Sequence, residues 1–267
     1  MGMTFLHEIG SGVHVLRHPV LDVNATLVVG GESALVVDTL STAVQAQELL
    51  AAVRRVTALP LTVVNTHHHF DHSFGNQVFA GAKIWAHEEA ARLIGPAMHA
   101  RAAVEYPDMA SELACTTPSA PTELVRAAAD LDLGDRPVQL RHFGRGHSIG
   151  DLAVLVPDAD VLIAGDLVEE SGPPQFDDAY PLDWPDTVAA LLARLTPDSR
   201  VVPGHGAVVG LPFVTAQHEH LAALAWLIRE GDADGAPPER VAAKSPFPQD
   251  VSLPAVQRGY LQLNALT

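Results

Sequence analysis

The feature that most constrains this chain is the run His-His-His-Phe-Asp-His at residues 67–72, which follows a short apolar segment. Residues 61–65 have the composition of a strand, and along extended backbone alternate side chains point to the same side. His67, His69 and Asp71 are therefore expected to converge, and His72 adds another ligand-type group. The pattern predicts a metal site at the end of a buried strand rather than a solvated histidine-rich turn.

Three further candidate sites lie downstream, each beside a glycine and each predicted in a loop after an apolar strand: His147, Asp166 and His205. Any one of them alone is more typical of a turn. Small flanking residues are, however, expected where backbone packs closely around a buried centre. Together with the first motif these sites supply five histidines and two aspartates, which suit a borderline ion such as Zn²⁺. Two dications would also neutralise the two carboxylates.

Hydrophobic periodicity and turn residues predict the order of the elements. Strands are expected at 13–18, 25–29, 34–38, 61–65, 83–86, 131–133, 138–143, 152–156, 161–164 and 200–202. Helices are expected at 42–56 with Ser41 as N-cap, near 184–195 with Asp183 as N-cap, and at 213–230, where Gly231 ends the helix. A further helix is expected to stop at Gly95-Pro96, before a helical excursion with loops over 97–123.

This order predicts an α/β (α+β layered) fold, with two packed sheets and helices outside. We expect a single domain over residues 1–267, with a helical C-terminal extension from about residue 211.

Charge and hydropathy exclude several classes of partner. The sequence carries 16 Lys and Arg against 32 Asp and Glu, a formal net charge of −16, so it repels phosphate backbones and anionic membranes. Neither a secretory signal nor a membrane span of roughly 18 apolar residues is apparent, which predicts a cytoplasmic protein without a membrane partner. Cys115 is the only cysteine, so no intrachain disulfide forms. A small-molecule substrate is expected, and homo-oligomerisation stays open.

The four motifs, in this order over residues 10–210, resemble the metallo-β-lactamase superfamily. The resemblance implies a four-layer αβ/βα sandwich with two metal ions, Zn²⁺ expected and Fe or Mn as alternatives, at one edge of the sheets. It implies that the first ion is held by His67, His69 and His147, the second by Asp71, His72 and His205, and that Asp166 bridges them. A metal-bridging hydroxide would be the nucleophile, and Asp71 would relay a proton to the leaving group.

Departures from some branches of the superfamily narrow the expected reaction. Branches with a cysteine in the second site are excluded, because position 166 is aspartate. Those branches also use a lysine three residues later to hold a substrate carboxylate, whereas this chain has Glu169. A lactonase-type tyrosine is missing close after Asp166, although Tyr180 is a candidate from the following loop. The remaining expectation is a hydrolase of a carboxylic ester, thioester, lactone or amide.

Two alternatives of other classes remain. One is a mononuclear iron persulfide dioxygenase-like oxidoreductase, which shares the first motif but needs only two His and an Asp. The other is a catalytically silent metal-binding protein, which predicts a lost ligand.

Around the site, His68 is expected to be a spacer or a hydrogen-bond donor, and Ser148 and Asp151 to support the imidazoles or cap a turn. The loops at 97–123 and 168–182 and the C-terminal helices are expected to wall the cleft. Residues 171–174, Phe176 and Tyr180 would form a mostly apolar rim, or else an oligomer contact.

Overall fold

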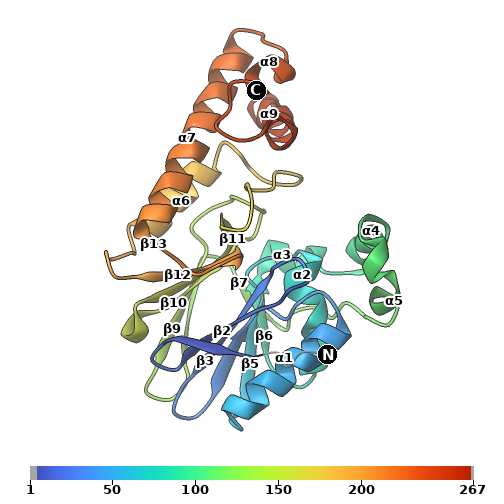
Figure 1. Cartoon of the computed structure of the whole chain (residues 1–267), viewed down its shortest axis with the longest axis vertical. Helices are drawn as coiled ribbons and strands as arrows, with labels where there is room; N and C mark the ends of the chain where they lie inside the picture. Colours follow the sequence, from blue (N-terminus) through green and yellow to red (C-terminus); the bar gives the residue numbers. More distant parts are fainter. Residues whose placement is uncertain (1–4, 266–267) are drawn as a thin grey trace.

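The computed structural model describes residues 5–265 and contains two β-sheets that pack face to face (Figure 1). The strand order of the first sheet is β1-β2-β3-β4-β5-β6-β7 and that of the second is β13-β12-β11-β10-β9-β8. The strands of the first sheet are His7–Gly10, Val13–Arg17, Asn24–Val29, Ala34–Val37, Leu61–Val64, Ile84–His87 and Glu123–Val125. Those of the second sheet, from β8 to β13, are Ala128–Asp132, Pro137–Arg141, Ala153–Val156, Val161–Glu169, Arg200–His205 and Val209–Gly210.

Alternating side chains build the core between the sheets and a second core outside each sheet. In β3, Val28 faces the opposite sheet while its neighbour Leu27 faces the outer helix. In β10, Val154 lies between the sheets and Leu155 faces outward. Strands buried on both faces need cover on both sides, which explains why apolar runs, rather than strict alternation, mark these strands in the sequence.

Helices cover the outer face of each sheet. α1 (Ala43–Val56) packs Ala46, Leu49 and Val53 against the first sheet. The second sheet is covered by α6 (Trp184–Leu192) and α7 (Leu211–Ala233), and α7 packs in turn against α8 (Pro238–Ala242) and α9 (Gln249–Asn264). Figure 1 shows α7, α8 and α9 extending well beyond the sheets. The layering is that of the four-layer αβ/βα sandwich predicted from the sequence.

Element ends differ from the sequence predictions in several places. Thr42, not Ser41, caps α1, with its hydroxyl accepting from the amide of Gln45 at 3.3 Å. Gly95-Pro96 was predicted to stop a helix, and Pro96 also begins the next helix, α4 (Pro96–Glu105), because proline suits the first helical turn. Gly231 does not end α7, which continues to Ala233; a Cβ at position 231 would lie 2.4 Å from a methyl of Val241 and 2.7 Å from the Tyr260 hydroxyl, so this helical position is packed too closely for a side chain. Strands β1, β7 and β13 were not predicted, since each is short.

The smaller elements lie mainly around one edge of the sheets. They are the helices α2 (Phe70–Ser73), α3 (Glu88–Leu93) and α5 (Ala110–Leu113), and 3₁₀ turns at Phe74–Phe79, Pro107–Met109 and Pro157–Ala159. The α4–α5 segment is the helical excursion expected over 97–123. Over residues 5–265, the structure has no helix of the length and apolarity that crossing a membrane requires.

Parallel pairing brings the ends of several strands to one edge. β4, β5 and β6 run parallel, and so do β11 and β12. The two sheets meet at this edge through Asn24 of β3, whose side-chain amide donates to the carbonyls of Pro203 and Gly206 at 2.9 Å each. All four sequence motifs lie along this edge.

Candidate metal centre

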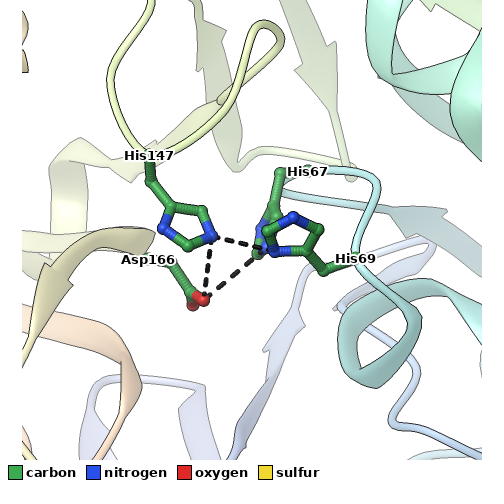
Figure 2. Close-up of side chains that lie close together, drawn as sticks. All are labelled: His67, His69, His147 and Asp166. Atoms are coloured by element: carbon green, nitrogen blue, oxygen red, sulfur yellow. Dashed lines mark hydrogen bonds and ion pairs between the residues drawn. The ribbon is translucent and has the colours of Figure 1, made fainter. Parts of the chain in front are cut away.

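A first group of four side chains converges from three parts of the chain: His67, His69, His147 and Asp166 (Figure 2). His69 Nδ1 and His147 Nε2 lie 2.9 Å apart, and one Asp166 oxygen lies 3.4 Å from His147 Nε2 and 3.6 Å from His67 Nε2. Four ligand atoms around a tetrahedral Zn²⁺ would be about 3.3 Å apart, given bonds of about 2.0–2.1 Å. The separations in this group fit such an ion.

A second group lies beside the first and contains Asp71, His72 and His205. Nε2 of His205 is 3.2 Å from an Asp71 oxygen and 3.3 Å from Nε2 of His72. The alternation argument holds for His67 and His69, but α2 begins at Phe70, with His69 at its N-cap. Because the backbone turns there, Asp71 joins the second group rather than the first.

Asp166 lies between the two groups. One of its oxygens is 3.1 Å from His72 Nε2, and the other is 3.4 to 3.6 Å from the Nε2 atoms of His67, His147 and His205. The sequence placed Asp166 in a loop after a strand, whereas it lies within β11, directly after Gly165 at φ +53°. A Cβ on Gly204 would lie 1.6 Å from this carboxylate, so the neighbouring strand leaves room only for glycine.

Several buried polar atoms of the centre have no hydrogen-bond partner among the described residues. They include His67 Nε2 and Asp166 Oδ1, although this oxygen lies 3.1 Å from His72 Nε2 without the geometry of a hydrogen bond. Buried polar atoms are normally satisfied, and each exception calls for an explanation. Here both atoms point into the space shared by the two groups, and a bound cation would satisfy both of them. The donor set of imidazole and carboxylate suits Zn²⁺.

The two groups differ in their protonation. In the first group, burial lowers the pKa of His67 and lowers that of His147 to about 4, so these imidazoles are neutral at pH 7, whereas for His69 burial is outweighed by Asp178, which raises the pKa. Burial alone would also lower the pKa of His72 and His205, but the charges of Asp166 and Asp71 outweigh it and raise both. For Asp71, burial is outweighed by His72 and His205, which lower its pKa to about 2. Protons on the second group therefore balance the carboxylates.

Outer partners fix the orientation of three imidazoles. Asp38 accepts from His72 Nδ1 at 2.8 Å and is itself held by the amide and hydroxyl of Thr66, at 2.7 Å each. His205 Nδ1 donates to the carbonyl of Leu21 at 2.7 Å. Asp178 lies 3.1 Å from His69 Nε2, which directs Nδ1 of that ring toward the centre. Such partners set the tautomer and raise the basicity of a metal-binding imidazole.

The other predicted neighbours have supporting positions. His68 belongs to neither of the two groups; its Nε2 lies 3.1 Å from Asp178, a contact that anchors this loop. Asp151 accepts from the amide and hydroxyl of Ser148, at 2.8 and 2.7 Å. That pair shapes the turn after His147 and, among the described residues, forms no hydrogen bond with the imidazole itself. Burial raises the pKa of Asp151 to about 7.

A cavity of about 360 Å³ opens over both groups. Its outer wall consists of residues from α4 and from the segment 171–178: Met98, Arg101, Ala102, Glu105, Tyr106, Ser171, Gly172, Pro173, Gln175, Asp177 and Asp178. Two parts of the expected wall are wrong. Phe176 is 2% exposed and packs against Trp184, and Tyr180 stacks with Arg145, so neither reaches the cavity. Residues of α7, α8 and α9 do not line it either, so far as residues 211–264 are concerned.

Sequence reasoning missed three residues of the site: Asp38, Tyr106 and Asp178. Asp38 had a detectable signal, because it ends a predicted strand that lies next to the one preceding His67. Tyr106 and Asp178 lie in irregular segments whose path no periodicity predicts. Tyr106 stacks on Phe70 with ring centroids 4.7 Å apart and borders the cavity.

A two-sheet sandwich with a histidine and aspartate centre at the edge shared by its sheets defines a class of metal-binding proteins. The chain belongs to the metallo-β-lactamase superfamily, whose family model matches residues 18–205. The solved metallo-β-lactamase from Pontibacter korlensis has a TM-score of 0.67 and 20% identity, covering 82% of this chain and 99% of that one. That likeness concerns the fold, and it confirms the fold class predicted from the sequence.

Curated relatives are also members of this superfamily by name. Acyl-coenzyme A thioesterase MBLAC2 from Gallus gallus is 30% identical over 183 residues, which is 61% of this chain and 66% of that protein. Metallo-beta-lactamase type 2 from Bacillus cereus is 29% identical over 87 residues, 32% of this chain and 34% of that protein. This chain therefore matches less than two thirds of the length of either relative.

Proposed function

We propose that this chain is a dinuclear metal-dependent hydrolase that cleaves a carboxylic ester, thioester, lactone or amide, with two Zn²⁺ ions as its cofactors. His67, His69 and His147 would hold the first ion, and Asp71, His72 and His205 the second. The observation that carries the proposal is the position of Asp166, whose two oxygens face both groups from a buried position between them. A carboxylate in that place is suited to bridging two cations.

Two ions at this centre would lower the pKa of a shared water, so that it serves as the nucleophile, and would polarise the substrate carbonyl. The residues of the chain have complementary tasks. The carboxylate of Asp71 borders the cavity and contacts His205, a position from which it would orient the ligand set and pass a proton to the leaving group. The cavity of about 360 Å³ is of the size that takes a small molecule.

The relatives support hydrolysis as the reaction class. The Gallus gallus and Bacillus cereus proteins are named as a thioesterase and a β-lactamase, and both of these enzyme types cleave an acyl bond. Glu169 borders the inner cavity, where β-lactamase branches of the family use a lysine for the substrate carboxylate. Penicillin-type hydrolysis is therefore the least favoured of the acyl-transfer reactions.

The two alternative functions have less support. A mononuclear iron dioxygenase needs only two histidines and an aspartate, yet here Asp71, His72 and His205 also converge. A silent protein is expected to lack a ligand, whereas all seven predicted positions carry one and lie around one centre. These observations favour a two-metal hydrolase over both.

The proposal is tested by a hydrolase screen on protein that has been stripped of metal and reloaded with Zn²⁺. Thioesters, lactones, aryl esters and amides are the substrates, and the stripped protein is the control. We expect at least one class to be cleaved by the reloaded protein and not by the stripped one. Absence of cleavage in all four classes would refute the proposal. Persulfide-dependent oxygen uptake by an iron-loaded sample would establish the dioxygenase alternative instead.

A further inference from the structure

The outer wall of the cavity carries an excess of negative charge. Apart from the proposed metal ligands, its acidic residues are Glu105, Asp177 and Asp178; Glu169 lies on the inner wall, where burial raises its pKa well above the usual range. Arg101 is the only arginine or lysine that lines the cavity, within residues 5–265. The wall therefore bears several carboxyl groups and a single permanent cation.

Arg101 already forms an ion pair with another residue of the wall. Its Nε donates to a Glu105 oxygen at 2.6 Å, one turn along the same helix. Arg258 lies behind the segment 171–178, where it donates to the backbone carbonyls of Asp177 and Ala179 at 2.9 and 2.7 Å. Its charge thus holds that segment in place from outside the cavity. Neither guanidinium is positioned as an open anion-binding group.

The carboxyl groups on the inner and outer walls have different surroundings. Asp177 is exposed, and its side chain forms no ion pair with any of residues 5–265, so it presents its charge to the opening. Asp178 lies deeper, between His68 and His69, and Glu169 is 7% exposed beside Asp166 and His205. Glu169 supplies no positive charge in either protonation state. The one arginine on this wall, Arg101, is paired with Glu105, so an anionic group on a substrate would meet mainly carboxylates.

We infer that the substrate carries a positive charge, an ammonium group, on the part of the molecule that lies outside the metal centre, and that anionic acyl compounds are disfavoured. The inference rests on the proposed function, because it names the substrate class of that site. The metal centre would take the acyl carbonyl, while Glu105, Asp177 and Asp178 would face the charged remainder. The net charge of −16 over the whole chain acts in the same direction.

The small size of the cavity makes this wall effective. A molecule held within about 360 Å³ keeps its charge within a Debye length of the wall, which is about 10 Å at 0.1 M salt. Salt should therefore weaken the preference without removing it. The inference also separates this chain from the Gallus gallus thioesterase, because the coenzyme A portion of an acyl-coenzyme A carries several phosphate charges.

Three thioesters of matched shape test the inference on the Zn²⁺-loaded protein. S-acetylthiocholine is cationic, S-(3,3-dimethylbutyl) thioacetate is its uncharged isostere, and S-acetyl-3-mercaptopropanoate is anionic. We expect kcat/KM to fall in that order by at least about fivefold at each step in 10 mM salt, and the differences to narrow in 0.5 M salt. An anionic thioester cleaved as well as the uncharged one would overturn the inference.

Binding of the corresponding thiols keeps the two proposals distinguishable. If none of the thioesters is cleaved, thioester hydrolysis fails as the function, but thiocholine and 3-mercaptopropanoate can still be compared by calorimetry. Tighter binding of thiocholine to the Zn²⁺-loaded protein supports an acidic cleft whatever the reaction is. Tighter binding of 3-mercaptopropanoate overturns the inference.

Two wall variants and one control assign the effect to these residues. Asp177→Asn removes an exposed charge, and Glu105→Gln releases Arg101 from its ion pair. Each should lower the cation-to-anion ratio of kcat/KM, or of thiol affinity, by at least about threefold. Asp234→Asn makes the same charge change at the exposed end of α7, away from the cavity, and should leave the ratio unchanged. Unchanged ratios in both wall variants would overturn the inference.

Discussion

Replacement of Asp166 by asparagine separates a metal-bridging role from a structural one. In the structure one Asp166 oxygen lies 3.1 Å from His72, and the other lies 3.4 Å from His147 and 3.5 Å from His205. Asp166→Asn keeps the size of the side chain but removes one of the two carboxylate charges that face the proposed ions. Asparagine is also a much poorer ligand for such a cation. We therefore expect the second ion to be lost more readily than the first.

The expected loss of turnover is at least about a hundredfold, which corresponds to about 2.7 kcal/mol of transition-state stabilisation. The sheets should still form, since their cores contain no residue of the centre. Thermal stability in the presence of Zn²⁺ should fall with the lost ion. Metal stoichiometry and turnover are measured on the same preparation. If Asp166 only shapes β11 beside Gly165, asparagine will substitute well, and full metal content with near-normal turnover would refute the bridging role.

Three further predictions concern the surroundings of the centre. Asp178→Asn should weaken metal binding about 10- to 100-fold without unfolding the protein, because His69 loses the carboxylate that fixes its tautomer; competition with a chromophoric chelator measures this. Affinity for the second ion should fall as pH is lowered from 8 to 6, more steeply than for the first, because both histidines of the second group, His72 and His205, have raised pKa values, whereas in the first group only His69 does. Equal pH slopes in calorimetry would contradict the difference. The folding stability of metal-free protein should depend on pH in the opposite direction, falling as pH rises. The stability that protonated His205 contributes is complete below the unfolded pKa of about 6.5 and is lost as pH rises through the raised folded value. Thermal melts at several pH values would detect this loss.

The sequence predicts the fold and the gathering of the seven residues because both depend on short-range patterns. Apolar segments locate the buried strands, and His67, His147 and His205 each follow or end one of them. Parallel pairing of β4 with β5 and of β11 with β12 brings strand ends to one edge, and β9 ends there too because antiparallel β10 separates it from β11. Which residues of the motif 67–72 join the first group and which join the second was not predictable in the same way. The turn of the backbone into α2 depends on the packing of Phe70 and Phe74 against α4.

The cavity wall is the part that sequence patterns describe least well. The aromatic residues Phe176 and Tyr180 were expected at the rim on the basis of composition. Phe176 is instead held in the core by Trp184 and Phe247, and Tyr180 by Arg145 and Arg258. Contacts between residues far apart in the chain decide which face of an irregular segment is exposed. That choice turns an expected apolar rim into one that bears Asp177 and Asp178.

The central claim is that one site holds two ions and that both are needed for hydrolysis. The most direct measurement is a stepwise titration of metal-stripped protein with Zn²⁺, in which bound metal and cleavage of the best substrate from the screen are followed together. We expect saturation at two equivalents, little turnover at the first equivalent and a steep rise with the second, with Asp166→Asn binding only one ion tightly. Saturation of both binding and turnover at a single equivalent would contradict it.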